Sequence, residues 1–160
     1  MTPSKHHIAR IMAVMEVAFD PAYGEAWNIR QITDALAMPS TRGLVIDGHG
    51  EIIGDDSPIE SSPSAAGFVL TRQAADEEEL LLIAVSPDFR QRGLGEGLIR
   101  TLFAQARSRG TTRIFLEMRR GNPAIHLYEK VGFKPIGERP NYYRLANGER
   151  VDAITFGRTI

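Results

Sequence analysis

The chain of 160 residues contains no cysteine. Disulfide bonds, cysteine nucleophiles and zinc sites built on cysteine are therefore excluded, and the absence is consistent with a reducing compartment. Long hydrophobic runs are missing too, since no stretch approaches the roughly 18 to 20 apolar residues of a membrane span. Residues 1–10 lack the apolar centre of a signal peptide. The sequence thus predicts a soluble, cytoplasmic protein without a membrane partner.

A surplus of charge of either sign is also absent. The formal net charge is −1 at pH 7, so no overall attraction to nucleic acid is expected. Lysine is scarce, and nearly all positive charge is arginine. Arginine suits phosphate recognition, although genome composition explains the bias at least as well. The four histidines do not have the spacing of metal ligands, and no metal site is predicted.

Length and composition predict one domain over residues 1–160 with a substantial core. Residues 47–64 are rich in Gly, Asp, Ser and Pro, and they predict a long, flexible hairpin loop. Hydrophobic periodicity predicts helices at about 6–19, 29–38, 94–110 and 123–131, and strands at about 44–47, 66–72, 79–85, 113–118, 134–139 and 152–158. This order of elements predicts a mixed α/β or α+β domain.

Three local signals mark element boundaries. Asn28 followed by Gln31 is typical of a capping box at a helix start. Gly132 is placed to end the helix at 123–131. Asn147-Gly148 is a strong hairpin signal between the last two predicted strands.

The most informative motif joins the predicted strand at 79–85 to the helix at 94. Its residues 90–97 read Arg-Gln-Arg-Gly-Leu-Gly-Glu-Gly. A strand, a glycine loop and a helix start together point backbone N–H groups and the positive end of a helix dipole at an anion. The glycine spacing is neither that of a dinucleotide fingerprint nor that of a P-loop. By itself the motif predicts a phosphate site at residues 92–97.

A second motif runs from residue 116 to 133 and reads LEMRRGNPAIHLYEKVGF. Together the two motifs resemble the Gcn5-related N-acetyltransferase (GNAT) superfamily: residues 90–95 match its acetyl-CoA pyrophosphate motif, and Asn122 with residues 124–133 matches its second cofactor motif. Within the superfamily the chain is most similar to the ribosomal-protein-alanine N-acetyltransferase (RimI-like) family. Three features carry the finer match: Glu117, Asn141-Tyr142-Tyr143 and Asp152-Ala153-Ile154.

The resemblance implies a mixed, mostly antiparallel central sheet flanked by helices. The chain departs from the family in three places. It begins at the first helix, so the family's usual first strand is missing or supplied otherwise. One residue is absent between Asn122 and Ala124, and Glu96 stands where a basic residue is frequent. A carboxylate beside a pyrophosphate is unfavourable unless it points away.

The resemblance also implies acetyl-CoA as co-substrate. The backbone of Ile83, Ala84 and Val85 would run along the pantetheine arm, and the Val85 N–H would stabilise the oxyanion. The pyrophosphate would be held by Gln91, Arg92, Gly93, Leu94, Gly95 and Glu96. Asn122 would bind the arm through its side-chain amide, although capping of the following helix is an equally good role.

Two catalytic residues follow from the same match. Glu117 would be the general base, and Tyr128 would protonate the departing CoA sulfur. An α-amine has a pKa near 8, so a modest base is enough to deprotonate it. The structural alternatives are a strand carboxylate that faces solvent or pairs with Arg119, and a tyrosine that packs in the core.

The predicted function is transfer of acetyl from acetyl-CoA to the N-terminal α-amine of a protein, with a ribosomal protein as expected acceptor, directly within a ternary complex. Two alternatives stay open: acetylation of a small amine or a lysine side chain, and a non-catalytic acyl-CoA-binding module. A homodimer is also open. Tyr142 and Tyr143 line the acceptor groove or cover the sheet, and residues 76–79 form a solvated turn or attract a cationic acceptor.

Overall fold

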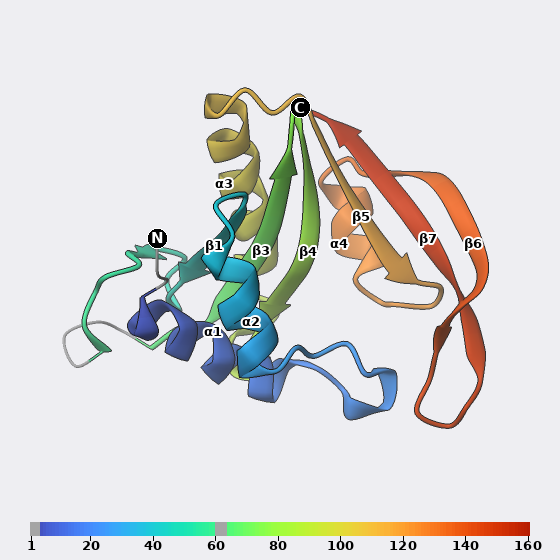
Figure 1. The fold of residues 1–160 in the computed structure, drawn as a ribbon, viewed down its shortest axis with the longest axis horizontal. Coiled ribbons are helices and arrows are strands. Elements are labelled where there is room, and N and C mark those ends of the chain that lie inside the picture. The colour runs from blue at the N-terminus through green and yellow to red at the C-terminus, as the bar shows by residue number, and fades with distance from the viewer. Residues whose placement is uncertain (1–3, 60–63) are drawn as a thin grey trace.

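The computed structural model describes residues 4–59 and 64–160, and Figure 1 shows its helices and strands around one sheet. The helices are α1 (Lys5–Ala18), α2 (Ile29–Ala37), α3 (Leu94–Ser108) and α4 (Ile125–Lys130), with short 3-10 helices η1 (Pro21–Tyr23) and η3 (Pro87–Phe89). The strands are β1 (Thr41–Ile46), β2 (Ile52–Ile53), β3 (Gly67–Ala74), β4 (Glu77–Val85), β5 (Arg113–Arg119), β6 (Lys134–Arg144) and β7 (Arg150–Thr159). No helix within the described ranges is long and apolar enough to cross a membrane.

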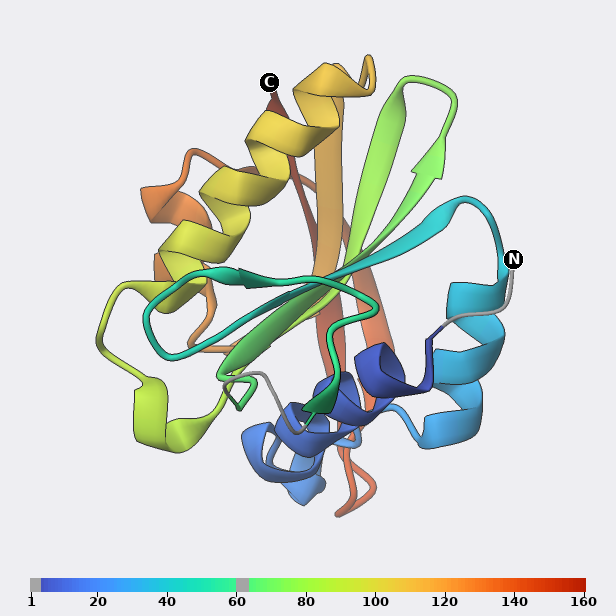
Figure 2. The ribbon, with the colours of Figure 1, turned by 90° about the vertical axis from the view of Figure 1, so that its left-hand side faces the viewer.

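The seven strands form one sheet in the order β2-β1-β3-β4-β5-β7-β6. Every neighbouring pair is antiparallel except β4 and β5, which are parallel. Helices α1 and α2 lie on one face of this sheet, and α3 and α4 lie on the other (Figure 2). The expected mixed, mostly antiparallel fold is confirmed. In the described residues before α1 there is no strand, and β2 occupies the sheet edge beyond β1.

Each face of the sheet has its own hydrophobic core. On the α1 side, Ile11, Val14 and Ile32 pack in one cluster with Phe68 and Leu70 of β3. On the α3 side, the second cluster joins the apolar positions of α3 to alternate residues of β5 and to α4, and it includes Leu98, Leu102, Ile114, Leu116 and Phe133. The helical and strand periodicities of the sequence therefore correspond to the two buried faces.

The three local boundary signals are confirmed. The Asn28 side chain accepts from the N–H of Gln31 at 2.8 Å, and the Gln31 side chain accepts from the N–H of Asn28 at 2.8 Å. Gly132 follows the end of α4 with a φ of +93°. The N–H of Gly148 donates to the carbonyl of Leu145 in the β6–β7 turn.

The sequence predicted no strand within residues 47–64, and β2 corrects this. Ile52 and Ile53 pair with the end of β1. The buried carboxylate of Asp47 accepts from the N–H groups of His49 and Glu51, which shapes the turn between the two strands. Two long-range contacts hold the later part of the loop, because Arg10 of α1 donates to the carbonyls of Ser57 and Pro58. Residues 60–63 of the predicted flexible loop lie outside the described residues.

The parallel strands β4 and β5 separate soon after they begin. Their pairing covers only Glu77–Glu79 with Arg113–Phe115. Just beyond, β4 carries one extra residue relative to β3, Leu81, and such a bulge bends a strand. The carboxyl ends of β4 and β5 therefore diverge in the middle of the sheet (Figure 1), and β4 keeps an unpaired edge there.

Candidate active site

The glycine motif forms the turn that leads from η3 into α3. Gln91 and Gly93 adopt left-handed backbone conformations, with φ of +62° and +77°. Gly93 is the N-cap of α3 and supplies no side-chain cap. The N–H groups of residues 94–96 therefore have no partner within the helix, and the first helical bond runs from Gly97 to Gly93. Free N–H groups at the start of a helix of 15 residues fit a phosphate.

Glu96 lies in this first turn, but two cations compensate its charge. Its carboxylate accepts from Arg100 at 2.8 Å and from Lys130 of α4 at 2.9 Å. Hydrogen bonds from Arg100 and Lys130 hold the pKa of Glu96 below its usual value. The side chain is thus directed toward α4 and the next turn of α3, which explains how an acidic residue is tolerated in a phosphate-binding turn.

The end of β4 offers backbone donors to the space between the diverging strands. The N–H of Ser86 donates to Ala66 on the β3 side at 2.8 Å. Because successive N–H groups of a strand point to opposite edges, those of Val85 and Ile83 face the open β5 side. The N–H of Ala84 faces β3 instead, where Ala84 pairs with Phe68. Of the three residues expected along the pantetheine arm, two can therefore donate to it.

Glu117 lies near the end of β5 and faces away from α3. Its neighbours Leu116 and Met118 are buried under α3 and α4, whereas the Glu117 side chain is about one-fifth exposed. Its Oε2 is 3.3 Å from Nε of Arg139 on β6 and accepts from the hydroxyl of Thr155 on β7 at 3.4 Å. The structure thus pairs Glu117 with Arg139 rather than with Arg119, and leaves part of the carboxylate open to a substrate.

Tyr128 lies on α4 and is almost fully buried, with its ring edge-on to Phe133 at 5.9 Å. Burial, and then the negative charge of Glu25, raise the pKa of the Tyr128 hydroxyl well above its usual value. The hydroxyl therefore stays protonated at neutral pH, as a proton donor must. Tyr128 packs in the core through its ring, and this does not exclude the expected role of its hydroxyl as proton donor.

Asn122 lies in the loop between β5 and α4 and uses both ends of its amide. Its carbonyl oxygen accepts from the N–H of Ala124 at 2.9 Å, so it caps the turn that precedes α4. Its NH₂ group donates to Glu25 at 3.4 Å. One further N–H of this amide is available to a cofactor arm.

Sequence reasoning missed Glu25, which lies between η1 and α2. Its Oε1 is 3.6 Å from Nε of Arg119, whose guanidinium carbon lies 3.5 Å from the ring centre of Tyr23. Burial raises the pKa of Glu25 and outweighs the attraction of Arg119. Glu25 is far from Arg119 and Asn122 in the sequence and meets them only in the tertiary structure. No sequence motif therefore marks it.

The Asn141-Tyr142-Tyr143 segment is linked to Glu117 through Arg139, whose guanidinium carbon lies 5.1 Å from the ring centre of Tyr142. Burial, together with the charge of Glu117, raises the pKa of Tyr143 to about 12. Tyr142 is about half exposed and stacks edge-on with Tyr143 at 5.1 Å. The charge of Glu117 thus reaches Tyr143, as expected if both residues belong to the acceptor groove.

The acidic stretch at 76–79 lies at the other end of β4, away from these residues. Its glutamates pair with Arg113, Arg109 and Arg72, and Glu78 is fully buried. These carboxylates are partners within the fold, which favours the structural interpretation of the stretch over attraction of an acceptor.

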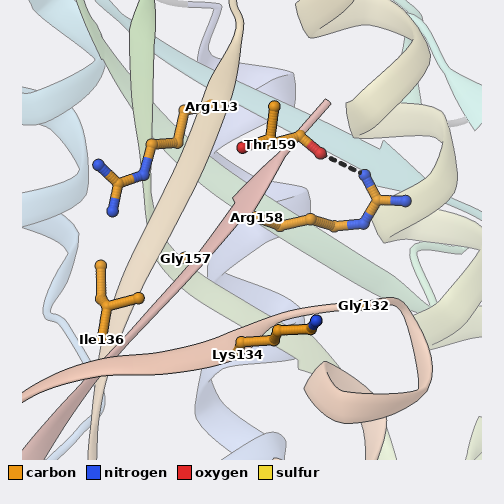
Figure 3. A pocket seen from close by; sticks show the side chains of 7 residues that line it. All are labelled: Arg113, Gly132, Lys134, Ile136, Gly157, Arg158 and Thr159. Atoms are coloured by element: carbon orange, nitrogen blue, oxygen red, sulfur yellow. Dashed lines mark hydrogen bonds between the residues drawn. The ribbon is translucent and has the colours of Figure 1, made fainter.

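A hollow of about 580 Å³ on the described surface also lies away from the predicted site. Figure 3 shows its lining residues, Arg113, Gly132, Lys134, Ile136, Gly157, Arg158 and Thr159. Arg158 donates to the carbonyls of Val131 and Thr159, so it is engaged within the fold. None of the predicted site residues lines this hollow. Across residues 4–59 and 64–160 no three His, Asp or Glu side chains converge on a metal-sized space.

Comparison with known proteins gives the same family as the motifs. Residues 11–133 match the sequence model of the Acetyltransferase (GNAT) family. A protein from Escherichia coli K12 named [ribosomal protein bS18]-alanine N-acetyltransferase is 42% identical over 130 residues, which cover 81% of this chain and 85% of that protein.

Solved structures agree with this assignment. The crystal structure of the ribosomal-protein-S18-alanine N-acetyltransferase from Escherichia coli gives a TM-score of 0.79 at 25% identity and covers 100% of this chain and 92% of that one. An aminoglycoside 6′-N-acetyltransferase complexed with coenzyme A shares the fold, with a TM-score of 0.70 at 18% identity over 95% of this chain and 89% of that one. The chain therefore belongs to the GNAT acetyltransferase family, as an acetyl-CoA-dependent acyltransferase similar to the ribosomal-protein-alanine N-acetyltransferases.

Proposed function

We propose that the protein acetylates the N-terminal α-amine of a protein, with ribosomal protein bS18 as the first candidate acceptor. The observation that carries the proposal is the position of Glu117, which lies on the strand that diverges from β4, with its carboxylate held by Arg139 and partly exposed. The 42% identity to a protein named for acetylating bS18 supports the same acceptor class. A ribosomal acceptor would place the reaction in the cytoplasm. We further propose that residues 1–160 form a single acetyltransferase domain.

In this proposal acetyl-CoA supplies an acetyl group activated as a thioester. The free N–H groups of residues 94–96 bind the pyrophosphate, and Asn122 and the N–H of Ile83 hold the pantetheine arm. The N–H of Val85 donates to the carbonyl oxygen on which negative charge develops. The chain has no cysteine to carry the acetyl group, which supports direct transfer within a ternary complex.

Protons move through two side chains. Glu117 accepts a proton from the attacking amine, directly or through one water molecule. Tyr128 donates a proton to the departing sulfur, and its raised pKa keeps that proton in place until then. Arg139 holds the Glu117 carboxylate in position through its Nε, which lies 3.3 Å from Oε2.

The test is acetylation of a peptide that carries the N-terminal sequence of bS18, with labelled acetyl-CoA. The same peptide with a blocked N-terminus, a lysine-containing peptide, polyamines and aminoglycosides complete the panel. We expect label only on the free N-terminus. Label on small amines or lysine alone would overturn the proposal.

Glu117→Gln tests the role of the base in the same assay. We expect kcat to fall by about 10² to 10⁴, the range that general base catalysis contributes. The matched control is Glu79→Gln, because Glu79 is also a part-buried strand carboxylate paired with an arginine, and lies at the far end of β4. The control should keep the activity of the unmodified protein.

A further inference from the structure

Residues 18–25, which we call the strap, connect α1 toward α2 and are fastened to the ends of both diverging strands. At the β4 end, Arg90 donates to the carbonyl of Ala18 at 2.7 Å and to that of Val85 at 3.0 Å. At the β5 end, Arg119 stacks on Tyr23 and faces Glu25. The strap therefore crosses the opening between β4 and β5, where a thioester and an amine have to meet.

A third attachment joins the strap to the hairpin of β6 and β7. The N–H of Ala146 donates to the carbonyl of Ala22 at 3.1 Å. Figure 1 shows the connection from α1 passing beneath the end of β5 toward this hairpin. The strap is thus fixed at three points, and Glu25 on it faces Arg119, which lies two residues beyond Glu117 on β5.

The two contacts of the partly exposed Glu25 carboxylate are both long. They measure 3.4 Å to Asn122 and 3.6 Å to Arg119, and the side chain is 30% exposed. Across the described residues, Nε of Arg119 is the one buried side-chain nitrogen or oxygen without a hydrogen bond. An ionised carboxylate can accept about four hydrogen bonds. Glu25 would therefore gain from another donor, above all from a cation.

Glu25 also lies within electrostatic reach of the proposed catalytic groups. Its negative charge helps to raise the pKa of Tyr128, and the charges of Glu117 and Glu25 both raise the pKa of Tyr143. Two carboxylates from different elements thus act on one region of the site. Arg119 and Arg139 each lie beside one of these carboxylates, but Arg119 makes no short hydrogen bond to Glu25. A protonated amine, a compact cation with several N–H donors, would supply one.

We propose that Glu25 is a specificity-determining residue that binds the protonated α-amine of the acceptor. An α-amine with a pKa near 8 arrives mostly as a cation at pH 7. Glu25 binds this cation and remains a carboxylate, while Glu117 accepts the single proton that the amine loses before attack. The assignment rests on the proposed function, and it adds a residue that selects a charged amine over a neutral group of the same shape.

Glu25→Gln tests the assignment, because it keeps the shape and removes the charge. The probes are the bS18-type peptide and its des-amino analogue, in which hydrogen replaces the N-terminal amine. We expect the KM of the amine peptide to rise about tenfold or more, as expected for loss of a hydrogen bond to a charged group. The inhibition constant of the des-amino peptide and the KM of acetyl-CoA should stay within about twofold.

The two peptides separate charge recognition from a loss of structure. If Glu25 only supported the strap, Glu25→Gln would weaken both peptides alike, and this would overturn the assignment. So would an unchanged KM for the amine peptide. Glu79→Gln removes a similarly exposed, paired carboxylate. It should change neither the KM of the amine peptide nor the inhibition constant of the des-amino peptide. If the unmodified protein acetylates no N-terminal peptide, the proposed function fails and the assignment of Glu25 fails with it, whereas a silent Glu25→Gln in an active protein overturns the assignment alone.

Discussion

Single carboxylates in this protein have different tasks because their surroundings differ. Glu78 is fully buried and accepts three hydrogen bonds from Arg109 and one from the hydroxyl of Thr111. Glu96 is compensated by two cations. Glu25 has two long contacts, and Glu117 keeps an open side. Burial and hydrogen bonding, rather than residue type, separate the structural carboxylate from those available to a substrate.

Glu78→Ala should lower the free energy of unfolding by about 3 to 5 kcal/mol, because it leaves the largely buried guanidinium of Arg109 without its partner. Its neighbour provides the control. Glu77→Ala removes a half-exposed carboxylate 3.4 Å from Arg113, and should cost about 0 to 1 kcal/mol. Urea denaturation of both variants measures the difference. Equal losses would show that Glu78 is not the anchor of this corner of the sheet.

His7 makes stability depend on pH. Burial lowers the pKa of His7 below its ordinary 6.5, while Asp55 acts in the opposite direction. The unfolded chain therefore takes up a proton more readily than the folded one as the pH falls. This histidine contributes stability above about pH 6.5 that is lost as the pH falls from there toward its lower folded pKa.

Urea denaturation near neutral pH and in mild acid measures this effect. When the pH is lowered from neutral to mild acid, the free energy of unfolding of the unmodified protein should decrease. The decrease should be smaller in His7→Gln. The quantity compared is the change in the free energy of unfolding between the two pH values within each protein. A loss of stability that the substitution causes equally at both pH values therefore cancels. The same pH dependence in both proteins would contradict the expectation.

At the scale of elements, the start of α3 combines two glycines with opposite requirements. Gly93 caps the helix with a left-handed φ of +77°, whereas Gly97 lies inside the helix. A Cβ atom at either position would meet nothing within 4 Å. Backbone conformation alone therefore decides the effect of a methyl group at each site.

Gly93→Ala should lower the free energy of unfolding by about 1 kcal/mol or more, because alanine is strained in the left-handed region. Gly97→Ala should raise it by about 0.5 to 1 kcal/mol, because alanine favours a helix interior over glycine. Urea denaturation of the pair tests both signs. A stabilised Gly93→Ala would mean that the turn does not hold this conformation in solution.

At the scale of the whole molecule, acetyl-CoA would join elements that are far apart in the chain. The proposed contacts come from the end of β4, the start of α3 and the loop before α4. Binding to the folded state alone adds about 2.7 kcal/mol of stability when the ligand is at a hundred times its dissociation constant. Saturating acetyl-CoA should therefore raise the melting temperature by several degrees. No shift in a thermal melt would contradict the proposed cofactor contacts.

Much of the fold could be predicted from the sequence, because it depends on local chemistry. Hydrophobic periodicity located the four α-helices and, among the described residues, all strands but β2, although β6 runs on to Arg144, beyond the predicted end at 139. The short 3-10 helices η1 and η3 were not predicted. Strand β2 has only two residues, too few for a periodic pattern, and pairing with β1 creates it.

The residues of the candidate site also fall into those that the sequence predicts and those that only the tertiary structure reveals. The glycine motif, Glu117 and Tyr128 are readable because they lie in motifs whose spacing is fixed along the chain. The ionic partner of Glu117 could not be read, and neither could the place of Glu25, since both depend on strand order and on where the strap crosses the sheet. The sequence by itself determined the family and the position of the phosphate-binding turn. The tertiary structure decided which charges meet, because contacts between distant segments arise only once the sheet has formed.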